Sequence, residues 1–377
     1  MSERLDVAAY YFPNYHPDPR NDAWHGRGWT EWDLLAAARP RYPGHRQPIT
    51  PAWGAFDESD PAWAAREIDL AADHGIDTFI FDWYHYEDGP YLQHALDRGF
   101  LRAANSQRLR FALMWANHDW LNIHPAAFVN RSDVLAPGAV SPAAFDRITD
   151  HVIADYFAQP NYWRLEGRPY FSIYDLGTFL AGLGGVDAAA QALRRFDDKT
   201  KSAGFPGVHL NVQVWGLKVL PSEVQVRDAA SLVRTLSFAS AGTYAWVHHH
   251  NPDSAGFPIG SYAKAAADNF AAWRRYRDEL PVPYMPTVQM GWDPSPRTVQ
   301  SDKYENKGYP WTAVLAGNTP EAFRAALLEA RSFIESADGG PRTLVINAWN
   351  EWTEGSYLLP DTVTGMAYLE AVQAATT

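Results

Sequence analysis

Hydrophobic residues along the 377-residue chain gather in short runs that alternate with longer segments of helical spacing. Eight of these runs are almost continuously apolar, which is typical of parallel strands covered on both faces. They span residues 7–12, 77–84, 110–115, 169–174, 208–214, 236–246, 283–289 and 343–349. Eight predicted strands separated by helical segments indicate a parallel sheet with helices packed around it.

Start and stop signals mark the helices between these strands. Asp60-Pro61, Ser141-Pro142 and Thr319-Pro320 each place a capping residue before a proline suited to the first helical turn. Gly75 and Gly204 stand where two of the helical segments end. We therefore expect helices over residues 60–74, 186–203, 270–280 and 366–375, and further helices that begin at 141 and 319.

The strict alternation of strands and helices predicts an α/β fold, a single (β/α)8 TIM barrel that forms one domain over residues 1–377. An open, doubly wound sheet is the alternative, but no Gly-x-Gly-x-x-Gly turn follows the first strand. The connections over 13–59 and 117–138 are unusually long. Both follow strands, so we expect them at the C-terminal mouth of the barrel, with residues 13–59 folded over it.

Charge and composition exclude several classes of partner. The 44 acidic and 32 basic residues give a net charge of −12, and the lysines and arginines are scattered, so nucleic acid is not an expected partner. No apolar run approaches the length of a membrane span, and we expect no membrane insertion. The run over 7–12 is too short for a signal-peptide core, which predicts a cytoplasmic protein. The composition makes no prediction about the oligomeric state.

Aromatic residues are abundant, with 16 Trp, 19 Tyr and 18 Phe. Many of the tryptophans stand beside Gly, Asn, Asp or His in predicted loops. Flat apolar rings next to hydrogen-bonding groups suit the faces and hydroxyls of sugars, which predicts an oligosaccharide or polysaccharide substrate. The alternative is a large barrel whose rim is simply rich in tryptophan.

The strongest chemical signal follows the eighth predicted strand. Glu351 and Glu354 stand three residues apart, framed by Trp349 and Trp352 and preceded by Asn350. If the chain curls there, such a pair lies about 5–6 Å apart, close to the separation in a retaining glycosidase. Apolar walls would raise the pKa of one carboxyl, as a general acid requires. The alternative is a helix N-terminus that favours acidic residues.

Polar and aromatic residues at the other strand ends and in the first loop are the candidate substrate contacts. They are Tyr11, His16, Trp32, Asp82, Trp83, Tyr84, Trp115, Asn117, Tyr174, Gln213, Tyr244, Trp246, Gln289, Trp292 and Asn350. Because side chains alternate along a strand, about half of such a set points away from the mouth. We nevertheless expect Trp83, Tyr84, Trp115, Asn117, Tyr174 and Trp246 to line the cavity that contains Glu351.

The run His248-His249-His250 suggests a metal site, but three consecutive residues cannot easily face one ion. We interpret this run as a loop lining the cleft or as plain surface. The chain has no cysteine, which excludes disulfides, zinc thiolates and a cysteine nucleophile. No phosphate-binding loop or nucleophile elbow is present in the sequence either. The sequence therefore predicts neither a metal nor a cofactor.

The segment Asn350-Glu351-Trp352-x-Glu354-Gly355 resembles the strand-eight motif of glycoside hydrolase family 99, and more closely that of the bacterial family-99-like (WbsX-type) proteins. The similarity runs from the first strand to the last. It also covers residues 9–17, Gly28-Trp29-Thr30-Glu31-Trp32, Pro43-Gly44-His45-x-Gln47-Pro48, Phe81-Asp82-Trp83-Tyr84 and Trp115-Ala116-Asn117.

The resemblance implies a (β/α)8 barrel and a retaining α-mannosidase-like hydrolase. It implies that Glu351 deprotonates the sugar 2-hydroxyl to form a 1,2-anhydro sugar, and that Glu354 is the acid that protonates the leaving group. The segment Asn117-His118-Asp119-Trp120 departs from the Asn-Glu-Asn-Trp of the WbsX-type group, so the sugar preference stays open. A glycosyltransferase of surface-polysaccharide synthesis and a non-catalytic carbohydrate-binding barrel are the alternative functions.

Overall fold

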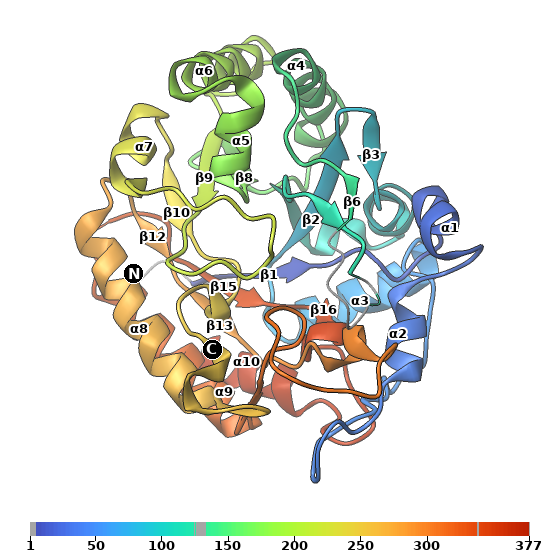
Figure 1. Ribbon diagram of the computed structural model, residues 1–377. Helices are drawn as coiled ribbons and strands as arrows, with labels where there is room; N and C mark the ends of the chain where they lie inside the picture. The colour runs from blue at the N-terminus through green and yellow to red at the C-terminus, as the bar shows by residue number, and fades with distance from the viewer. Residues whose placement is uncertain (1–4, 124, 126–132, 338, 377) are drawn as a thin grey trace.

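The computed structural model of the protein describes residues 5–123, 125, 133–337 and 339–376. Parallel strands form the central sheet, whose main path runs in the order β12-β10-β9-β8-β4-β2-β1-β15-β13 (Figure 1). These strands are β1 (Asp6–Tyr11), β2 (Thr78–Tyr86), β4 (Arg110–Trp115), β8 (Arg168–Ile173), β9 (His209–Gln213), β10 (Ser240–Gly242), β12 (Tyr284–Met285), β13 (Thr287–Gln289) and β15 (Thr343–Asn347).

The first and last strands in this order, β12 and β13, are consecutive parts of one segment of the chain. β12 pairs with β10 and β13 pairs with β15, and Pro286 alone separates β12 from β13. Proline has no N–H to donate to a sheet, so the seventh strand is interrupted there. The sheet thus closes into a barrel of eight strand positions, and the predicted (β/α)8 barrel is confirmed. The prediction of one continuous strand over 283–289 is corrected to two short ones.

Helices surround the barrel, as Figure 1 shows. They are α1 (Pro19–His25), α2 (Glu31–Ala37), α3 (Pro61–Asp73), α4 (Pro142–His151), α5 (Leu176–Leu183), α6 (Val186–Ser202), α7 (Ala229–Thr235), α8 (Tyr262–Glu279), α9 (Pro320–Glu335) and α10 (Ala367–Thr376). Within the described residues no single helix is long and apolar enough to cross a membrane, although the bent pair of α5 and α6 passes by length and composition.

The predicted helix starts are confirmed at three positions. The side chains of Asp60, Ser141 and Thr319 accept hydrogen bonds from backbone N–H groups of the first turns of α3, α4 and α9. By contrast, α8 begins at Tyr262, eight residues before the predicted start, because Ser261 caps it. The sixth strand is also shorter than predicted, since the residues before Ser240 form the turn that closes α7.

Side-chain alternation along the strands decides which residues enter the barrel. Tyr10 points inward, and its hydroxyl donates to Gln213 at 3.2 Å. The Gln213 amide in turn donates to Ser172 at 2.9 Å and to Asn211 at 3.0 Å. All four residues are buried, so a polar layer closes the barrel interior beneath its C-terminal mouth.

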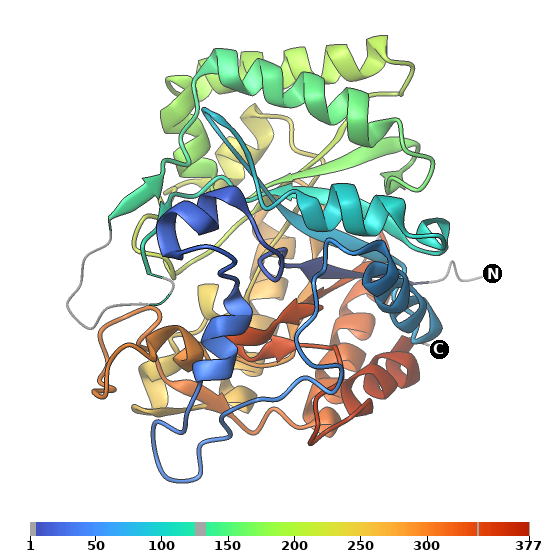
Figure 2. The ribbon, with the colours of Figure 1, turned by 90° about the vertical axis from the view of Figure 1, so that its right-hand side faces the viewer.

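The long first connection lies at this mouth, the end of the barrel where it was expected. Figure 2 shows the blue segment that contains α1 and α2 on the same side of the barrel as the orange segment near residue 300. Two contacts hold the connection there: His45 binds the Asp293 carboxylate at 2.8 Å, and Trp32 packs against Trp352 with ring centroids 6.1 Å apart. The predicted end of the barrel is confirmed, but residues 13–59 flank the mouth and do not fold over it, since none of them lines the cavity that opens there.

Several shorter strands lie outside the main path. They are β3 (Gly89–Tyr91), β5 (Trp120–Leu121), β6 (Val134–Ala136), β7 (Arg164–Leu165), β11 (Ile259–Ser261), β14 (Val314–Ala316), β16 (Asn350–Glu351) and β17 (Ser356–Tyr357). The hairpin of β16 and β17 follows β15 directly, and Gly355 turns it with a φ of 66°, a conformation that glycine adopts readily. This hairpin carries both candidate catalytic glutamates.

Candidate active site

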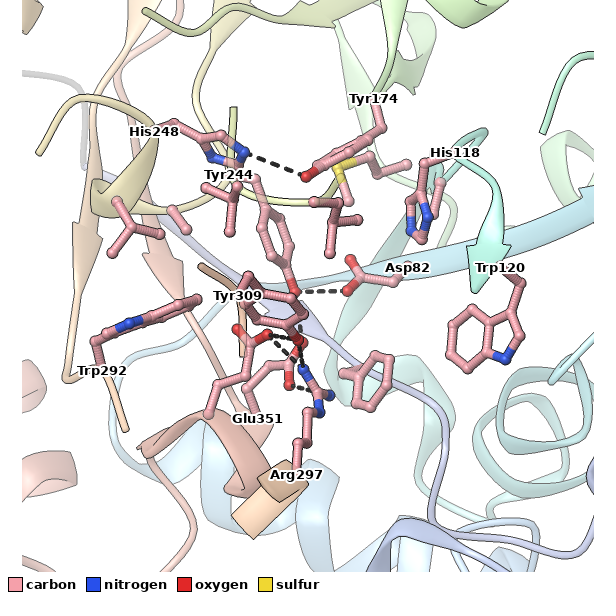
Figure 3. Close-up of a pocket in the computed structure, with 18 of the residues that line it drawn as sticks. Asp82, His118, Trp120, Tyr174, Tyr244, His248, Trp292, Arg297, Tyr309 and Glu351 are labelled. Atoms are coloured by element: carbon pink, nitrogen blue, oxygen red, sulfur yellow. Dashed lines mark hydrogen bonds and ion pairs between the residues drawn. The ribbon is translucent and has the colours of Figure 1, made fainter. Parts of the chain in front are cut away.

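A cavity of about 550 Å³, counted up to its open mouth, lies at the C-terminal ends of the barrel strands. Every one of the eight strand positions contributes a wall residue, either from the strand end or from the loop that follows it. This is the place where active sites form in (β/α)8 barrels. Figure 3 shows acidic and aromatic side chains converging on the cavity from different strands.

Glu351 and Glu354 both contact the guanidinium group of Arg297. Arg297 Nη2 lies 3.4 Å from Glu351 Oε2, and Arg297 Nη1 donates to Glu354 Oε1. The hydroxyl of Tyr309 also donates to Glu354 Oε1, at 2.7 Å. All four side chains are buried. The structure therefore brings the two predicted carboxylates together on one cation.

A third carboxylate, from the first loop, completes the charge around Arg297. Arg297 Nη2 lies 3.1 Å and 3.0 Å from the two carboxylate oxygens of Glu31. Thr353, between the two candidate catalytic residues, donates its hydroxyl to the same carboxylate. Glu31 and Arg297 are almost completely shielded from solvent, so three carboxylates share one buried positive charge.

Tyr244 connects the pair to a fourth acid. Its hydroxyl lies 2.7 Å from Asp82 Oδ2 and 2.9 Å from Glu351 Oε1 (Figure 3). Asp82 leaves the inner face of β2, and Tyr244 stands two residues after β10. The ring of Tyr10 packs against that of Tyr244, with centroids 4.7 Å apart, and holds the phenol in place. Asp82, Tyr244 and Glu351 thus form a continuous hydrogen-bonded row.

Burial dominates the acid–base behaviour of this cluster. Removal from water raises the pKa of the Glu351 and Glu354 carboxyls, and their mutual repulsion raises the pKa of Glu351 further. Arg297 opposes the shift at both residues. Burial likewise raises the pKa of Asp82 well above its ordinary value. The cluster thus holds more carboxyl groups than positive charge, and burial disfavours the ionised forms of Asp82, Glu351 and Glu354.

The opposite wall contains a second hydrogen-bonded group. The Tyr174 hydroxyl donates to Glu223 at 2.6 Å and lies 3.3 Å from Nε2 of His248. His248 Nε2 is in turn 3.2 Å from the Glu223 carboxylate, and Trp215 stacks on the imidazole at 5.2 Å. Burial raises the pKa of Glu223, but the His248 imidazole together with the hydrogen bonds from Tyr174 and the Val219 N–H lowers it overall. This wall therefore presents a fixed phenol and a fixed imidazole to the cavity.

Between the two polar walls the lining is apolar. Met114 and Ala116 come from β4 and the residue after it, and Val219 and Leu220 come from the loop after β9. The indole of Trp292 forms a further side, and its N–H donates away from the cavity to Thr312 at 3.0 Å. An apolar surface flanked by hydrogen-bonding groups is compatible with a ring that has apolar faces and polar edges.

Seven of the seventeen predicted site residues line this cavity, and four of the seven are aromatic. The seven are Asp82, Tyr84, Tyr174, Tyr244, Trp292, Glu351 and Glu354. The structure places the other ten outside the cavity, for reasons that follow from side-chain direction.

The structure corrects four predicted aromatic contacts, which point outward into the layer of helices. Trp83 packs near Tyr156, and Trp115 stacks on Phe145 of α4 at 5.6 Å. The indole N–H of Trp246 donates to the Thr287 carbonyl at 2.7 Å, and that ring packs against residues of α8. The hydroxyl of the fourth residue, Tyr11, lies 3.2 Å from Glu58 Oε2 and 3.1 Å from Glu67 Oε2 beneath the first loop. Strand alternation turns Trp83 and Trp115 away from neighbours that do face the cavity.

Two predicted glutamine contacts belong to the scaffold of the barrel. Gln213 lies in the polar layer of the interior. The side-chain oxygen of Gln289 accepts a hydrogen bond from the Trp246 backbone N–H, and its side-chain NH2 donates to the Gly291 backbone carbonyl. The polar atoms of both side chains are thereby used by the protein itself, and neither residue lines the cavity.

Four further predicted contacts fix loops instead of reaching the cavity. Asn117 bonds to both the N–H and the carbonyl of Asp175, and Asn350 does the same with Phe12. His16 Nδ1 binds Glu58 at 2.8 Å. Trp32 donates its indole N–H to the Phe56 carbonyl at 2.7 Å. Each of these side chains satisfies backbone or carboxylate groups that the long loops would otherwise leave buried and unpaired.

These corrections weaken the aromatic composition as evidence for a sugar substrate. Of the six residues expected to line the cavity, only Tyr84 and Tyr174 do so. Of the 16 tryptophans, all of which the structure describes, Trp120 and Trp292 alone line the cavity, so the tryptophan excess does not by itself indicate a sugar substrate. The evidence for carbohydrate chemistry rests on the acidic cluster and the apolar wall.

The three consecutive histidines point to three different partners. His248 contacts Glu223 and Tyr174, His249 lies 2.9 Å from the Thr243 hydroxyl, and His250 binds Asp268 at 2.7 Å. They do not converge on one point. Among the residues that the structure describes, no group of three or more His, Asp or Glu side chains has the geometry to hold a metal ion.

Sequence reasoning missed the residues that surround the carboxylates. Arg297 and Tyr309 lie in the long loop after β13, where no motif signals them. Glu31 stands beside the predicted Trp32, but a glutamate that opens a helix is normally exposed. His118 and His248 also line the cavity. A lone arginine in an aromatic loop at the barrel mouth is the one signal that could have pointed to Arg297.

Comparisons with known proteins agree with this architecture. An endo-α-mannosidase of glycoside hydrolase family 99 from Bacteroides thetaiotaomicron is 14% identical, with a TM-score of 0.61 over 98% of this chain and 95% of that one. A structure described as a glycoside hydrolase-like protein is 14% identical, with a TM-score of 0.63 over 100% of this chain and 95% of that one. At such identities the likeness is one of fold.

Sequence comparison reaches closer relatives. The uncharacterized protein WxcX of Xanthomonas campestris pv. campestris strain B100 is 29% identical over 373 residues, which are 98% of this chain and 49% of the relative. The chain thus spans about half the length of the curated relatives it matches. The model of the family described as "Glycosyltransferase WbsX" matches residues 7–372. Because that match covers nearly the entire sequence, the chain belongs to the WbsX family.

Proposed function

We propose that the protein is a retaining glycoside hydrolase in which Glu351 and Glu354 are the catalytic pair. The observation that carries the proposal is the contact of both carboxylates with one buried guanidinium group, at the mouth of the barrel and beside an apolar wall. Two acids with shifted pKa values in one cavity are what glycosidic cleavage requires. The fold shared with family 99 hydrolases supports the same reaction class.

In the proposed first step, Glu351 removes the proton of the sugar 2-hydroxyl. The freed oxygen attacks the anomeric carbon, the bond to the leaving oxygen breaks, and Glu354 gives that oxygen its proton. In the second step, Glu354 takes a proton from water, the water oxygen opens the 1,2-anhydro ring, and Glu351 returns its proton to the 2-oxygen. Two inversions at the anomeric carbon give net retention.

Binding of the substrate determines which of the two carboxyls, Glu351 or Glu354, carries the proton. Both carboxyls have raised pKa values in the free protein, and they differ in their partners. A sugar 2-hydroxyl donates to Glu351 and favours its ionised form, whereas a glycosidic oxygen can only accept and favours protonated Glu354. Arg297 and Tyr309 both contact Glu354 and limit how far its pKa rises. A general acid near neutrality needs this balance.

The description of the family as glycosyltransferases names the main alternative. A transferase that uses a nucleotide sugar must bind a diphosphate, which needs free positive charge. In the described part of the cavity wall Arg297 is the only arginine, and three carboxylates surround it. Such a surface repels a diphosphate. A purely sugar-binding barrel would have no need of two acids that share one cation.

The test is to follow glycoside cleavage directly. The protein should be incubated with aryl glycosides and with bacterial polysaccharides, while proton NMR records the anomer of the product released first. The proposal predicts cleavage with retained configuration, and no cleavage of substrates that lack the 2-hydroxyl. Glu351→Gln should be inactive, while Glu370→Gln, an exposed carboxylate on α10, should match the wild type. Inversion, or transfer from a nucleotide sugar without hydrolysis, would overturn the proposal.

A further inference from the structure

The hydroxyl of Tyr244 lies between two carboxylate oxygens, 2.7 Å from Asp82 Oδ2 and 2.9 Å from Glu351 Oε1. A phenol has one hydrogen and can donate to only one of them in full. Both separations are nevertheless within hydrogen-bond range. The second short contact therefore needs a second proton, which must belong to one of the two carboxyl groups.

The surroundings of the two acids differ. Glu351 Oε2 faces the guanidinium group of Arg297 at 3.4 Å, which favours the ionised form of Glu351. Within the described residues, no lysine, arginine or histidine forms an ion pair with Asp82. Its other oxygen, Oδ1, is buried and has no hydrogen-bond partner. An ionised carboxylate in such a place is costly, whereas a neutral carboxyl is tolerated.

The groups that face Asp82 strengthen this difference. They are the phenols of Tyr10, Tyr84 and Tyr244 and the carboxyls of Glu351 and Glu354. None of them is a cation, and the two glutamates disfavour a further negative charge. Burial and the charge of Glu354 both raise the pKa of Asp82, which agrees with the geometry.

We propose that Asp82 is protonated in the working protein and donates to the Tyr244 oxygen, so that Tyr244 donates to Glu351. Asp82 is then a positioning residue that acts through Tyr244, since it fixes the direction of the phenol hydrogen. In this row Glu351 is ionised, and its Oε1 accepts the hydrogen bond from Tyr244. Its Oε2 then faces Arg297 and is the oxygen that can accept the proton of the substrate. This role rests on the proposed function of Glu351 as the base, whereas the protonation of Asp82 does not.

Infrared spectroscopy tests the protonation without any substrate. The protein labelled with carbon-13 in its aspartate side-chain carboxyls should show, at pH 7, the band of a protonated carboxylic acid, and Asp82→Asn should lack it. Tyr244→Phe should keep the band at a shifted frequency, because the acid loses its acceptor; this variant also serves if Asp82→Asn does not fold. A wild type without this band would overturn the inference, whatever the protein does to glycosides.

The pH profile of kcat/KM on an activated aryl glycoside tests the role. In Asp82→Asn the side-chain amide N–H donates to Tyr244 as the protonated carboxyl does. The acid limb of the pH profile should therefore stay in place, and kcat/KM should fall by less than about tenfold. Tyr244→Phe removes the hydrogen-bond donor to the Glu351 carboxylate. Its kcat/KM should fall by about 10- to 100-fold, and the acid limb should move to higher pH. If Asp82 is ionised instead, Asp82→Asn removes a neighbouring negative charge and moves the limb to lower pH, which would contradict the inference.

Discussion

Arg297 holds the carboxylate of Glu31 with nitrogen–oxygen distances of 3.0 and 3.1 Å, although 266 residues separate the two in the chain. The contact joins the loop after the first barrel strand to the loop after the seventh. Because the same guanidinium group contacts Glu351 and Glu354, the closure of the first loop and the charge of the candidate catalytic pair depend on one side chain. Arg297 is therefore both a structural and an electrostatic centre of the site.

Replacing Arg297 by methionine should destabilise the protein strongly. The change leaves buried carboxylates without their cation, which costs about 3–5 kcal/mol in comparable cases. Urea unfolding at pH 7 measures the loss. The control is Arg39→Met, whose ion pair with Asp302 is exposed and should contribute under about 1 kcal/mol. Equal losses in the two variants would contradict the structural role of Arg297.

The inward and outward aromatic residues should behave differently. Trp115→Ala should lower the free energy of unfolding by about 3–5 kcal/mol, because the ring is buried against Phe145 and Phe179. Trp292→Ala removes a cavity wall and should weaken sugar binding more than Trp115→Ala does. Urea unfolding together with KM for a cleaved glycoside separates the two effects. A raised KM in a folded Trp115→Ala protein would show that Trp115 contributes to the site.

Glu67 should make stability depend on pH. Burial raises the pKa of this carboxyl to about 8, although it accepts hydrogen bonds from Trp349 and Tyr11. Between the ordinary glutamate pKa and about 8, the folded state holds a proton that the unfolded state releases. Stability should therefore fall as pH rises through this window, by up to about 1.4 kcal/mol per pH unit.

The matched variant is Glu67→Gln, which imitates the protonated carboxyl and does not titrate. Urea unfolding of both proteins at several pH values from 5 to 8 gives the comparison. The stability of Glu67→Gln relative to the wild type should increase steadily with pH. A difference that stays constant over this range would mean that Glu67 is ionised in the folded protein.

The sequence was sufficient to predict the barrel and the position of the candidate catalytic pair. Near-continuous apolar runs and capped helix starts are local features, and Glu351 and Glu354 follow a strand directly. The break in the seventh strand could also have been read from Pro286. The direction of side chains at the strand ends was less accessible. Trp83 and Tyr84 are neighbours in sequence, yet one packs against helices and the other lines the cavity.

The remaining site residues depend on tertiary contacts that no local pattern encodes. Arg297 and Tyr309 reach the carboxylates from a loop without regular periodicity, and Glu31 meets them only after the first loop packs against the rim of the barrel mouth. Asn117 and Asn350 illustrate the converse case. Each is polar and follows a strand, but its side chain pairs with the backbone of a neighbouring loop.

The central claim is that Glu351 acts on the sugar hydroxyl and Glu354 on the leaving group. The most direct measurement is the ratio of kcat/KM for an activated aryl glycoside to that for a poor leaving group, in the wild type, Glu351→Gln and Glu354→Gln. Glu354→Gln should lose about 10²–10⁴-fold on the poor leaving group and much less on the activated one, so its ratio should rise. Glu351→Gln should lose activity on both substrates, with the ratio little changed. Near-normal turnover of Glu351→Gln, or equal losses on both substrates in Glu354→Gln, would contradict the account.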